Sequence, residues 1–335
     1  MELALSSKAF RVDWETVYPK AAKYSLLATL VCLGQLVVLF RQLHYTETPA
    51  AAARVSILCI GHQSILDAVV CVVHLLLCAF LPQLFTAFAS VAFFKLVIFI
   101  IVEMRYIVVI SHSRDPQRFF AGGINQLRQE WALIHLRFYA VLFLVLAAMY
   151  TFQSNSDALV LVAYSYWVPQ IVTNAMRDVR EPFSRAYLYG MSLSRLVVPF
   201  YLYGCPRNLA KVLLVEKMEP RYSMCLALVV WTAVQVGMLH LQQLKGPRFM
   251  VPSRFLPARY NYQRTLPPSL AATLEEEGSE HECPICYAGV SVHPRPPRTY
   301  AITPCDHIFH PECLERWMAQ KLECPVCRAA LPPNG

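Results

Sequence analysis

One segment decides how the C-terminal end of this chain folds, and along the chain it reads Cys283-Pro-Ile-Cys286, then Cys305-Asp-His307-Ile-Phe-His310-Pro-Glu-Cys313, then Cys324-Pro-Val-Cys327. Its cysteine and histidine side chains form four close pairs. The two members of such a pair can reach the same Zn²⁺ ion through one tight turn, and a tetrahedral site needs two pairs. The spacing therefore predicts two structural zinc ions. Because the segment has few large apolar residues, we expect zinc binding to supply most of the free energy that orders it.

The ligand order Cys, Cys, Cys, His, His, Cys, Cys, Cys resembles the RING-H2 class of RING fingers at every ligand and every short spacing. In that family the two zinc sites are interleaved along the chain. The resemblance implies a first zinc held by Cys283, Cys286, His310 and Cys313, and a second zinc held by Cys305, His307, Cys324 and Cys327.

Four further residues match positions that RING-type ubiquitin ligases use. The resemblance implies that Ile285, Trp317 and Pro325 form an apolar groove for a ubiquitin-conjugating enzyme (E2). Arg328 has the position of a linchpin cation that bridges the E2 and its thioester-bound ubiquitin, and a planar guanidinium can donate to two carbonyls at once. Catalysis would then be by positioning, without a ubiquitin thioester on this chain. The alternative is a zinc module that serves only protein contacts.

The composition places most of the chain in a membrane. Apolar residue types make up 56% of the 335 residues and charged types only 16%, which is more apolar than a soluble protein of this length. The net charge of +8 comes from basic residues spread between apolar runs, so we interpret it as loop charge and expect no nucleic-acid partner. The expected surroundings are a lipid bilayer.

Apolar runs near the length of a membrane span recur along the chain, and we expect the first one to be a span and not the core of a secretory signal peptide. A helix needs about 20 mostly apolar residues to cross the hydrocarbon layer. We therefore expect an α-helical polytopic membrane protein of about seven spans with a small C-terminal cross-braced two-zinc RING domain. The predicted spans cover residues 24–41, 55–80, 84–110, 133–153, 158–176, 186–204 and 223–243.

This division predicts four parts: a short lumenal segment at 1–23, a multispan region at 24–243, a cytosolic linker rich in proline and aromatic residues at 244–280, and the RING-H2 finger at 281–331. Ubiquitin and its conjugating enzymes are cytosolic, so the finger must face the cytosol to act. An odd number of spans then places the N-terminus in the lumen. The positive-inside rule agrees after the third and fifth spans and in the linker, but it disagrees at the N-terminus and between the last two spans.

Polar residues inside predicted spans are costly and therefore informative. Gln63, Asp67 and His74 are spaced by four and seven residues, so a helix carries them on one face. Gln170, Asn174 and Arg177 share a face at the fifth predicted span, and we count Gln170 and Asn174 with the possible polar site. One interpretation is an intramembrane polar site that recognises polar residues in the membrane segments of client proteins. The other is a set of interhelical hydrogen bonds.

Two further features of the predicted spans are a single Pro-Gln element and a pair of charged residues. The element Trp167-Val-Pro169-Gln170 resembles the Pro-Gln element of PQ-loop transporters, which carry it in two repeats, whereas we find one. Pro169 is expected to kink its helix. Glu103 and Arg105 lie near the predicted cytosolic end of the third span, and we expect both to be interfacial charges.

The linker is expected to run extended along the membrane face. The multispan region with its Trp-Val-Pro-Gln element, Gly246-Pro-Arg-Phe249, Tyr260-Asn-Tyr262 and the C-terminal finger together resemble the transmembrane ubiquitin ligases of the fungal Dsc complex and their plant relatives, the Flying Saucer ligases. Members of that family carry a large lumenal domain before the first span, and we expect segment 1–23 to be too short to supply it.

The resemblance implies a membrane-embedded RING-type E3 ubiquitin ligase. Such a protein recruits a ubiquitin-charged E2 and promotes ubiquitin transfer to protein substrates, membrane proteins in particular, for quality control or turnover. It also implies partner subunits of a membrane ligase complex and a location in Golgi, endosome or ER membranes. The alternative, from a different class, is a seven-span transporter or receptor with a zinc-binding interaction module.

Overall fold

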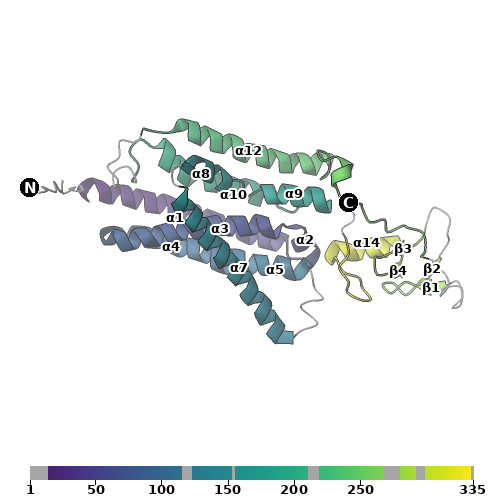
Figure 1. Cartoon of the computed structure of the whole chain (residues 1–335). Helices are drawn as coiled ribbons and strands as arrows, with labels where there is room; N and C mark the ends of the chain where they lie inside the picture. The colour runs from purple at the N-terminus through teal and green to yellow at the C-terminus, as the bar shows by residue number, and fades with distance from the viewer. Residues whose placement is uncertain are drawn as a thin grey trace, which may run out of the picture.

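The computed structural model describes residues 14–114, 123–152, 155–209, 219–267, 280–291 and 299–332. Its helices form a long bundle, and a small module of short strands and one helix lies at one end of that bundle (Figure 1). The fold class expected from the sequence, a helical membrane region followed by a small two-metal module, is confirmed.

The helices of the bundle mostly run back and forth along one axis, and the helix Gly123–Thr151 crosses them obliquely (Figure 1). In chain order they are α1 (Trp14–Tyr45), α2 (Pro49–Arg54), α3 (Ile57–Phe80), η1 (Pro82–Leu84), α4 (Phe85–Leu96), η2 (Val97–Glu103), α5 (Met104–Arg114), α7 (Gly123–Thr151), α8 (Ser156–Ala163), α9 (Val168–Arg177), α10 (Arg185–Pro199), η4 (Phe200–Gly204) and α12 (Tyr222–Lys245).

Five helical stretches within the described residues are long and apolar enough to cross a membrane. They are Trp14–Tyr45, Ile57–Phe80, Pro82–Arg114, Arg128–Thr151 and Tyr222–Lys245. These stretches correspond to the first four predicted spans and the last one. The predicted count of seven is not confirmed, because the remaining two segments are not among these five stretches. Residues 158–176 are divided between α8 and α9, and residues 186–204 form α10 followed by the π-helix η4.

The break between α8 and α9 corrects the expectation that Pro169 kinks a helix. Pro169 lies in the first turn of α9, where a proline loses no helical hydrogen bond. Just before it, the indole N–H of Trp167 donates to Ser192 Oγ at 2.9 Å, and the Trp167 backbone N–H donates to Gln235 Oε1 at 3.2 Å. Side chains of α10 and α12 therefore hold the chain at the point where the helix is interrupted.

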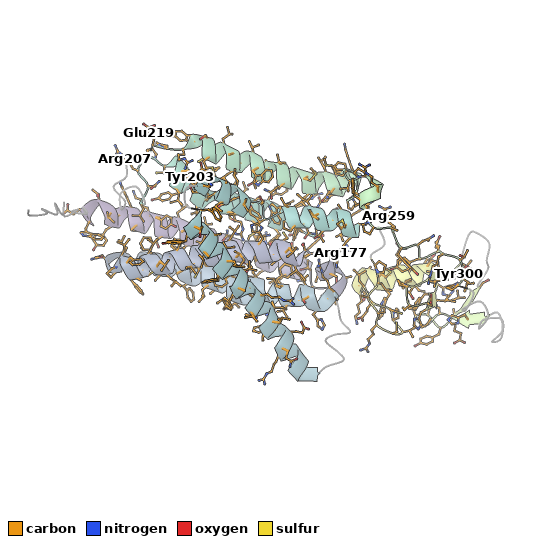
Figure 2. The ribbon with its side chains drawn as sticks, in the orientation of Figure 1. Arg177, Tyr203, Arg207, Glu219, Arg259 and Tyr300 are labelled. Atoms are coloured by element: carbon orange, nitrogen blue, oxygen red, sulfur yellow. The ribbon has the colours of Figure 1, made fainter. Side chains whose placement is uncertain are left out.

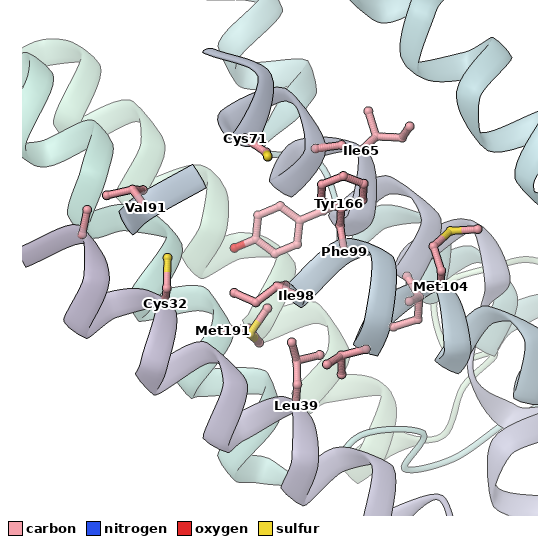
Figure 3. Packing of buried hydrophobic residues seen from close by; sticks show 14 of the residues in the cluster. Cys32, Leu39, Ile65, Cys71, Val91, Ile98, Phe99, Met104, Tyr166 and Met191 are labelled. Atoms are coloured by element: carbon pink, nitrogen blue, oxygen red, sulfur yellow. The ribbon is translucent and has the colours of Figure 1, made fainter. Parts of the chain in front are cut away.

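The core of the bundle lies where α1 packs between α4 and α10, and where α3 packs against α4 and η2. Figure 3 shows side chains from this region meeting closely, among them Cys32, Leu39 and Met191. Gly190 permits a close approach of α10 to α1, because a Cβ atom there would lie 2.8 Å from Val38 Cγ2. A small residue at this crossing thus sets the spacing between two helices.

The terminal module contains two short hairpins and one helix. β1 (Glu280–Glu282) pairs antiparallel with β2 (Gly289–Ser291), and β3 (Ala301–Ile302) pairs antiparallel with β4 (Ile308–Phe309). α14 (Pro311–Gln320) follows and packs against α2 of the bundle. Between α12 and this module, residues 246–267 form turns and one short helix, η5 (Ser253–Phe255), and are not extended throughout.

Candidate metal centre and intramembrane polar clusters

Two turns of the terminal module have the same backbone design. In the first, the Tyr287 N–H donates to Cys283 O at 2.8 Å and the Cys283 N–H donates to Ala288 O at 2.9 Å. The second repeats both bonds, from Arg328 to Cys324 O at 2.9 Å and from Cys324 to Ala329 O at 2.8 Å. In each turn a Cys-Pro-x-Cys sequence closes on itself and directs its two thiols to one side. This geometry is suited to two thiolate ligands of one ion.

The eight predicted ligands fall into two groups, and within each group all ligand atoms lie within 4.8 Å of one another. Tetrahedral zinc sites with bonds of about 2.0–2.3 Å place their ligand atoms roughly 3.3–3.8 Å apart. The distances that join Cys286 Sγ to His310 Nδ1 (3.3 Å) and Cys305 Sγ to His307 Nδ1 (3.4 Å) agree with this spacing. The expectation of two zinc-type sites is confirmed. The groups are Cys283, Cys286, His310 and Cys313, and Cys305, His307, Cys324 and Cys327.

Groups outside the ligand set orient the ligands. The Nε2 atom of His310 lies 3.2 Å from Gly289 O, so an N–H there leaves Nδ1 free to face the ion. Thr303 is fully buried, and its hydroxyl lies 3.1 Å from Cys305 Sγ and accepts from the His307 N–H at 3.1 Å. Sequence reasoning missed Thr303. Its position two residues before the third ligand was the available signal.

The residues expected to form the E2 groove lie on three separate elements. Ile285 is the third residue of the turn Cys283–Cys286. Pro325 is the second residue of the turn Cys324–Cys327. Trp317 lies on α14, and its indole N–H donates to Glu323 O at 2.7 Å, which ties it to the segment that leads into Pro325. All three side chains are partly exposed, and Arg328 is exposed.

The linker contributes to the core of the terminal module. Tyr262 is 7% exposed, its backbone O accepts from the Ile302 N–H at 2.7 Å, and its hydroxyl donates to Pro332 O at 2.5 Å. The Tyr260 hydroxyl donates to Ile302 O at 2.9 Å. Burial raises the pKa of both phenols, so they stay protonated as donors at neutral pH. The Tyr-x-Tyr step is therefore packed into the metal-binding module.

Of the polar residues predicted inside the second span, Gln63 and His74 bond to other helices. The Tyr187 hydroxyl of α10 donates to Gln63 Oε1 at 3.1 Å. The hydroxyl of Tyr24 on α1 lies 2.8 Å from His74 Nε2, and His74 Nδ1 lies 2.7 Å from Val70 O. Both side chains are buried by protein. The interpretation as interhelical hydrogen bonds fits these contacts.

Asp67 lies at the centre of a buried ionic cluster. Its carboxylate accepts from Lys95 Nζ at 2.5 Å and from Arg195 Nη2 at 2.7 Å. Arg195 also lies 3.5 Å from Glu103 Oε1. All four side chains are at most 7% exposed. The cluster joins α3, α4, η2 and α10 with two positive and two negative groups, so its formal charges balance.

The position of Glu103 corrects an expectation. We expected Glu103 and Arg105 to be interfacial charges, and Arg105 is exposed, but Glu103 is fully buried in the π-helix η2. The signal was present in the sequence, because Asp67, Lys95, Glu103 and Arg195 all lie inside apolar runs. An unpaired charge there costs about 2.5–3.5 kcal/mol, which two opposite pairs avoid.

Gln170 and Asn174 connect α9 to its neighbours. Gln170 Oε1 accepts from the Ser56 N–H at 2.7 Å, and its amide N–H donates to Arg54 O at 3.1 Å and to Asn174 Oδ1 at 2.8 Å. Asn174 Nδ2 in turn donates to Gln242 Oε1 on α12 at 2.9 Å. These two residues thus tie the start of α3 to α12, at the end of the bundle near the metal-binding module.

Comparison with known proteins gives matches along both parts of the chain. Residues 13–255 match the family model described as Transmembrane E3 ligase/DUF2921 transmembrane domain, and residues 281–328 match the Ring finger domain. The chain is 38% identical over 329 residues to "Transmembrane E3 ubiquitin-protein ligase FLY2" of Arabidopsis thaliana, an alignment that covers 98% of this chain and 56% of that protein.

A fungal relative is more distant. Identity to "DSC E3 ubiquitin ligase complex subunit 1" of Schizosaccharomyces pombe is 28% over 382 residues, covering 92% of this chain and 53% of that protein. The chain thus spans about half the length of these curated relatives. No solved structure matches the chain.

Proposed function

Because the chain belongs to the family of transmembrane E3 ligases, as the resemblance predicted, we propose that it is a membrane-embedded RING-type E3 ubiquitin ligase. Its metal-binding module recruits a ubiquitin-charged E2 and promotes transfer of ubiquitin to a protein substrate. The substrates are membrane proteins that are marked for quality control or turnover. The observation that carries the proposal is the pair of interleaved Cys/His clusters, whose turns present Ile285 and Pro325.

The orientation of α14 supports access of an E2. Pro311 and Glu315, one turn apart, face the bundle and line the space between the two parts of the chain. Trp317 is not among the residues that line this space. A partner that docks on Trp317 therefore does not need to enter the space between the bundle and the module.

The proposed ligase acts by positioning. All six cysteines of the module belong to the two metal-binding groups, which leaves none as an acceptor of ubiquitin. Zinc bound there supplies rigidity, and the chain's own surface then fixes the E2 and its thioester-linked ubiquitin. Holding a flexible conjugate in a reactive conformer lowers the entropic part of the barrier. We assign this role to Arg328 as the linchpin and to Ile285, Trp317 and Pro325 as the docking groove.

The module faces the cytosol in this proposal, and the protein resides in the endomembrane system, in Golgi, endosome or ER membranes. Basic residues at the module's end of the bundle support the orientation, among them Arg54, Arg177, Arg180 and Lys245. A fungal relative is named as a subunit of an E3 ligase complex, and we propose that this chain likewise has membrane partner subunits. The helix α7 offers a surface for these subunits, because only 11% of its apolar stretch within Arg128–Thr151 is buried by the rest of the chain.

We assign the intramembrane residues Gln63, Asp67, His74, Gln170 and Asn174 to the framework of this region. Each has hydrogen-bond partners on other helices or on neighbouring backbone, as described above. The client-recognition interpretation requires polar groups that remain available to an incoming helix. The existing contacts favour the interpretation as interhelical bonds.

The test is single-turnover discharge of ubiquitin from a loaded E2, measured beside binding of the unloaded E2. Arg328→Ala should slow discharge about tenfold or more with near-parent E2 binding, because an orientation contact is lost. Ile285→Ala should impair both binding and discharge, because it removes apolar area from the docking surface. Zinc content of both variants should equal that of the parent. The proposal fails if neither variant changes discharge.

The second candidate, a transporter or receptor with a zinc-binding interaction module, rests on the single Trp-Val-Pro-Gln element. Within the structure that element anchors the interrupted helix and the α3–α9 contact. The discharge assay separates the two candidates, since an interaction module leaves the rate of ubiquitin discharge unchanged.

A further inference from the structure

A cavity of about 790 Å³ lies between the bundle, the linker and the metal-binding module. Its walls come from the ends of α2, α5 and α9, from linker residues 257–263, and from α14 and the last residues of the module. Figure 2 shows Arg177 and Arg259 at this junction. Small-molecule sites in proteins have volumes of about 300–1,000 Å³, so the cavity has the size of a ligand site.

The lining of the cavity is strongly basic. Five arginines line it against two carboxylates, and no lysine or histidine is among the lining residues. Such an excess of guanidinium groups in a concave site concentrates anions, above all phosphate groups that accept paired hydrogen bonds. The arginines are Arg54, Arg114, Arg177, Arg248 and Arg259, and the carboxylates are Asp178 and Glu315.

Three of these arginines already have partners in the chain. Arg248 and Arg259 both pair with the carboxylate of Asp178. Arg114 Nη2 donates to Val55 O at 2.6 Å, which satisfies a carbonyl just beyond the end of α2. Charge balance and helix-end capping therefore account for these three side chains.

Arg54 and Arg177 remain without an explanation of this kind. Among the described residues, the side chain of neither donates a hydrogen bond or forms an ion pair. Arg177 is exposed and Arg114 is partly buried, and both line the same cavity. Bringing like charges together costs free energy that a bound anion recovers. The arrangement indicates a ligand with at least one phosphate group.

The cavity lies near the end of the spans. Arg114 and Lys245 are the last residues of two candidate spans. Beyond Lys245 the linker exposes Met250 (57%) and Phe255 (62%), and the Arg254 guanidinium lies over the Phe255 ring at 4.6 Å. Exposed apolar side chains beside arginines are typical of a segment that lies in the headgroup layer of a membrane.

We propose that this cavity binds a phosphorylated polyol headgroup, with Arg54 and Arg177 as the principal phosphate contacts and Arg114 beside them. The same chemistry is offered by a phosphoinositide lipid and by a free inositol phosphate. Because the linker and α14 form part of the wall, occupancy also fixes the metal-binding module relative to the bundle. This site is separate from the proposed E2 groove, and its test requires no ubiquitin.

The experiment uses the full chain in phosphatidylcholine nanodiscs, titrated with fluorescent inositol trisphosphate. Saturable binding is expected, and Arg54→Gln with Arg177→Gln should raise the Kd at least about tenfold. The matched control, Arg180→Gln with Arg185→Gln, removes two exposed arginines from the same end of the bundle outside the cavity lining and should bind like the parent. Equal melting temperatures and zinc contents of the two double variants establish that both are folded.

A second arm distinguishes the sources of the phosphate. If a lipid is the ligand, including phosphatidylinositol bisphosphate in the nanodisc should compete with the soluble probe, and inorganic phosphate should not. If a soluble inositol phosphate is the ligand, the lipid should leave the Kd unchanged. Absence of saturable binding in every arm, or an equal loss in the cavity variant and the control, overturns the proposal.

Discussion

Single residues in the metal-binding turns have an unusual backbone. Among the described residues, five that are not glycine have positive φ, and three of these lie in the metal-binding turns: Tyr287 (59°), Asp306 (61°) and Arg328 (59°). A left-handed conformation costs a residue with a side chain about 1–2 kcal/mol. Glycine would be the less strained choice at Arg328, so a side chain is kept at this position at a conformational cost.

This strain gives a prediction that separates stability from activity. Arg328→Gly should keep both zinc ions and raise the stability of the module by about 1 kcal/mol, because the left-handed strain is relieved. The same change should abolish most of the ubiquitin discharge. Tyr287→Gly is the matched control at the equivalent position of the first turn, and it should gain stability without losing discharge. A parent-like discharge rate for Arg328→Gly would exclude the linchpin role.

Thr303 supports a second prediction at this scale. Thr303→Val removes the hydroxyl that contacts Cys305 Sγ and the His307 backbone, so zinc affinity at that site should fall about 10-fold or more. Thr303→Ser keeps the hydroxyl and should retain affinity near the parent's. Competition with a chromogenic chelator measures the difference. Equal zinc affinities in the valine and serine variants would show that the contact is incidental.

The buried ionic cluster of Asp67, Lys95, Glu103 and Arg195 supports a third prediction at the scale of residues. Lys95→Met leaves Asp67 with one cation instead of two, so the variant should lose about 3–5 kcal/mol of stability. Adding Asp67→Asn leaves Arg195 with Glu103 and should recover a measurable part of that loss, as coupled residues do. Thermal unfolding in nanodiscs is the measurement, with the exposed Arg105→Met as control. Additive effects of the two changes would contradict the cluster.

Helices could be predicted from the sequence where the signal for them lies within the helix itself. The long apolar runs fixed five spans, because length and apolarity alone distinguish a span. The interrupted segments were harder, since the break between α8 and α9 depends on Ser192 and Gln235, which lie on distant helices and bond to Trp167. Likewise, the partners of Asp67 are 28 and 128 residues away, beyond any helical periodicity. Local spacing identified the metal ligands, but it could not show which helices meet.

The crossing of α1 and α10 yields a prediction at the scale of elements. Gly190→Leu inserts a side chain where even a Cβ atom would lie 2.8 Å from Val38 Cγ2, so the helices must separate and stability should fall by about 1–3 kcal/mol. Gly34→Leu places the same side chain at a position of α1 where no atom lies within 4 Å of the added Cβ, and should be neutral. Thermal unfolding of both variants in nanodiscs compares them. Equal melting temperatures would show that the crossing tolerates a wider spacing.

At the scale of the whole molecule, the linker joins two parts that the sequence presented as separate. Tyr260 and Tyr262 pack into the module, while Asp178 at the end of α9 holds Arg248 and Arg259 of the linker. Composition predicted an extended linker, whereas the described residues 246–267 also form turns and η5. Composition could not reveal these anchors, because they depend on aromatic and charged partners elsewhere. The module is therefore fixed to the bundle at several points, which gives it a defined position relative to the bundle.

This arrangement also makes the topology testable. α1 begins at the end of the bundle opposite the metal-binding module, and α12 leads directly into the linker at the module's end (Figure 1). In Figure 2, Arg207 and Glu219 lie at the far end, and Arg177 and Arg259 lie beside the module. If the bundle axis crosses the bilayer, the two ends of the described chain lie on opposite sides, whether or not the interrupted helices count as complete spans.

Protease added to sealed vesicles with the cytosolic face outward should therefore remove an epitope fused after Gly335 and spare one fused before Met1. The physical reason is that the bundle's arginines at the module's end resist translocation, whereas the bilayer shields the opposite end. Detergent should make both epitopes sensitive, which controls for intrinsic resistance. Cleavage of both epitopes in intact vesicles would mean that one of the long helices does not cross the membrane, and protection of the C-terminal epitope would place the module in the lumen, away from any charged E2.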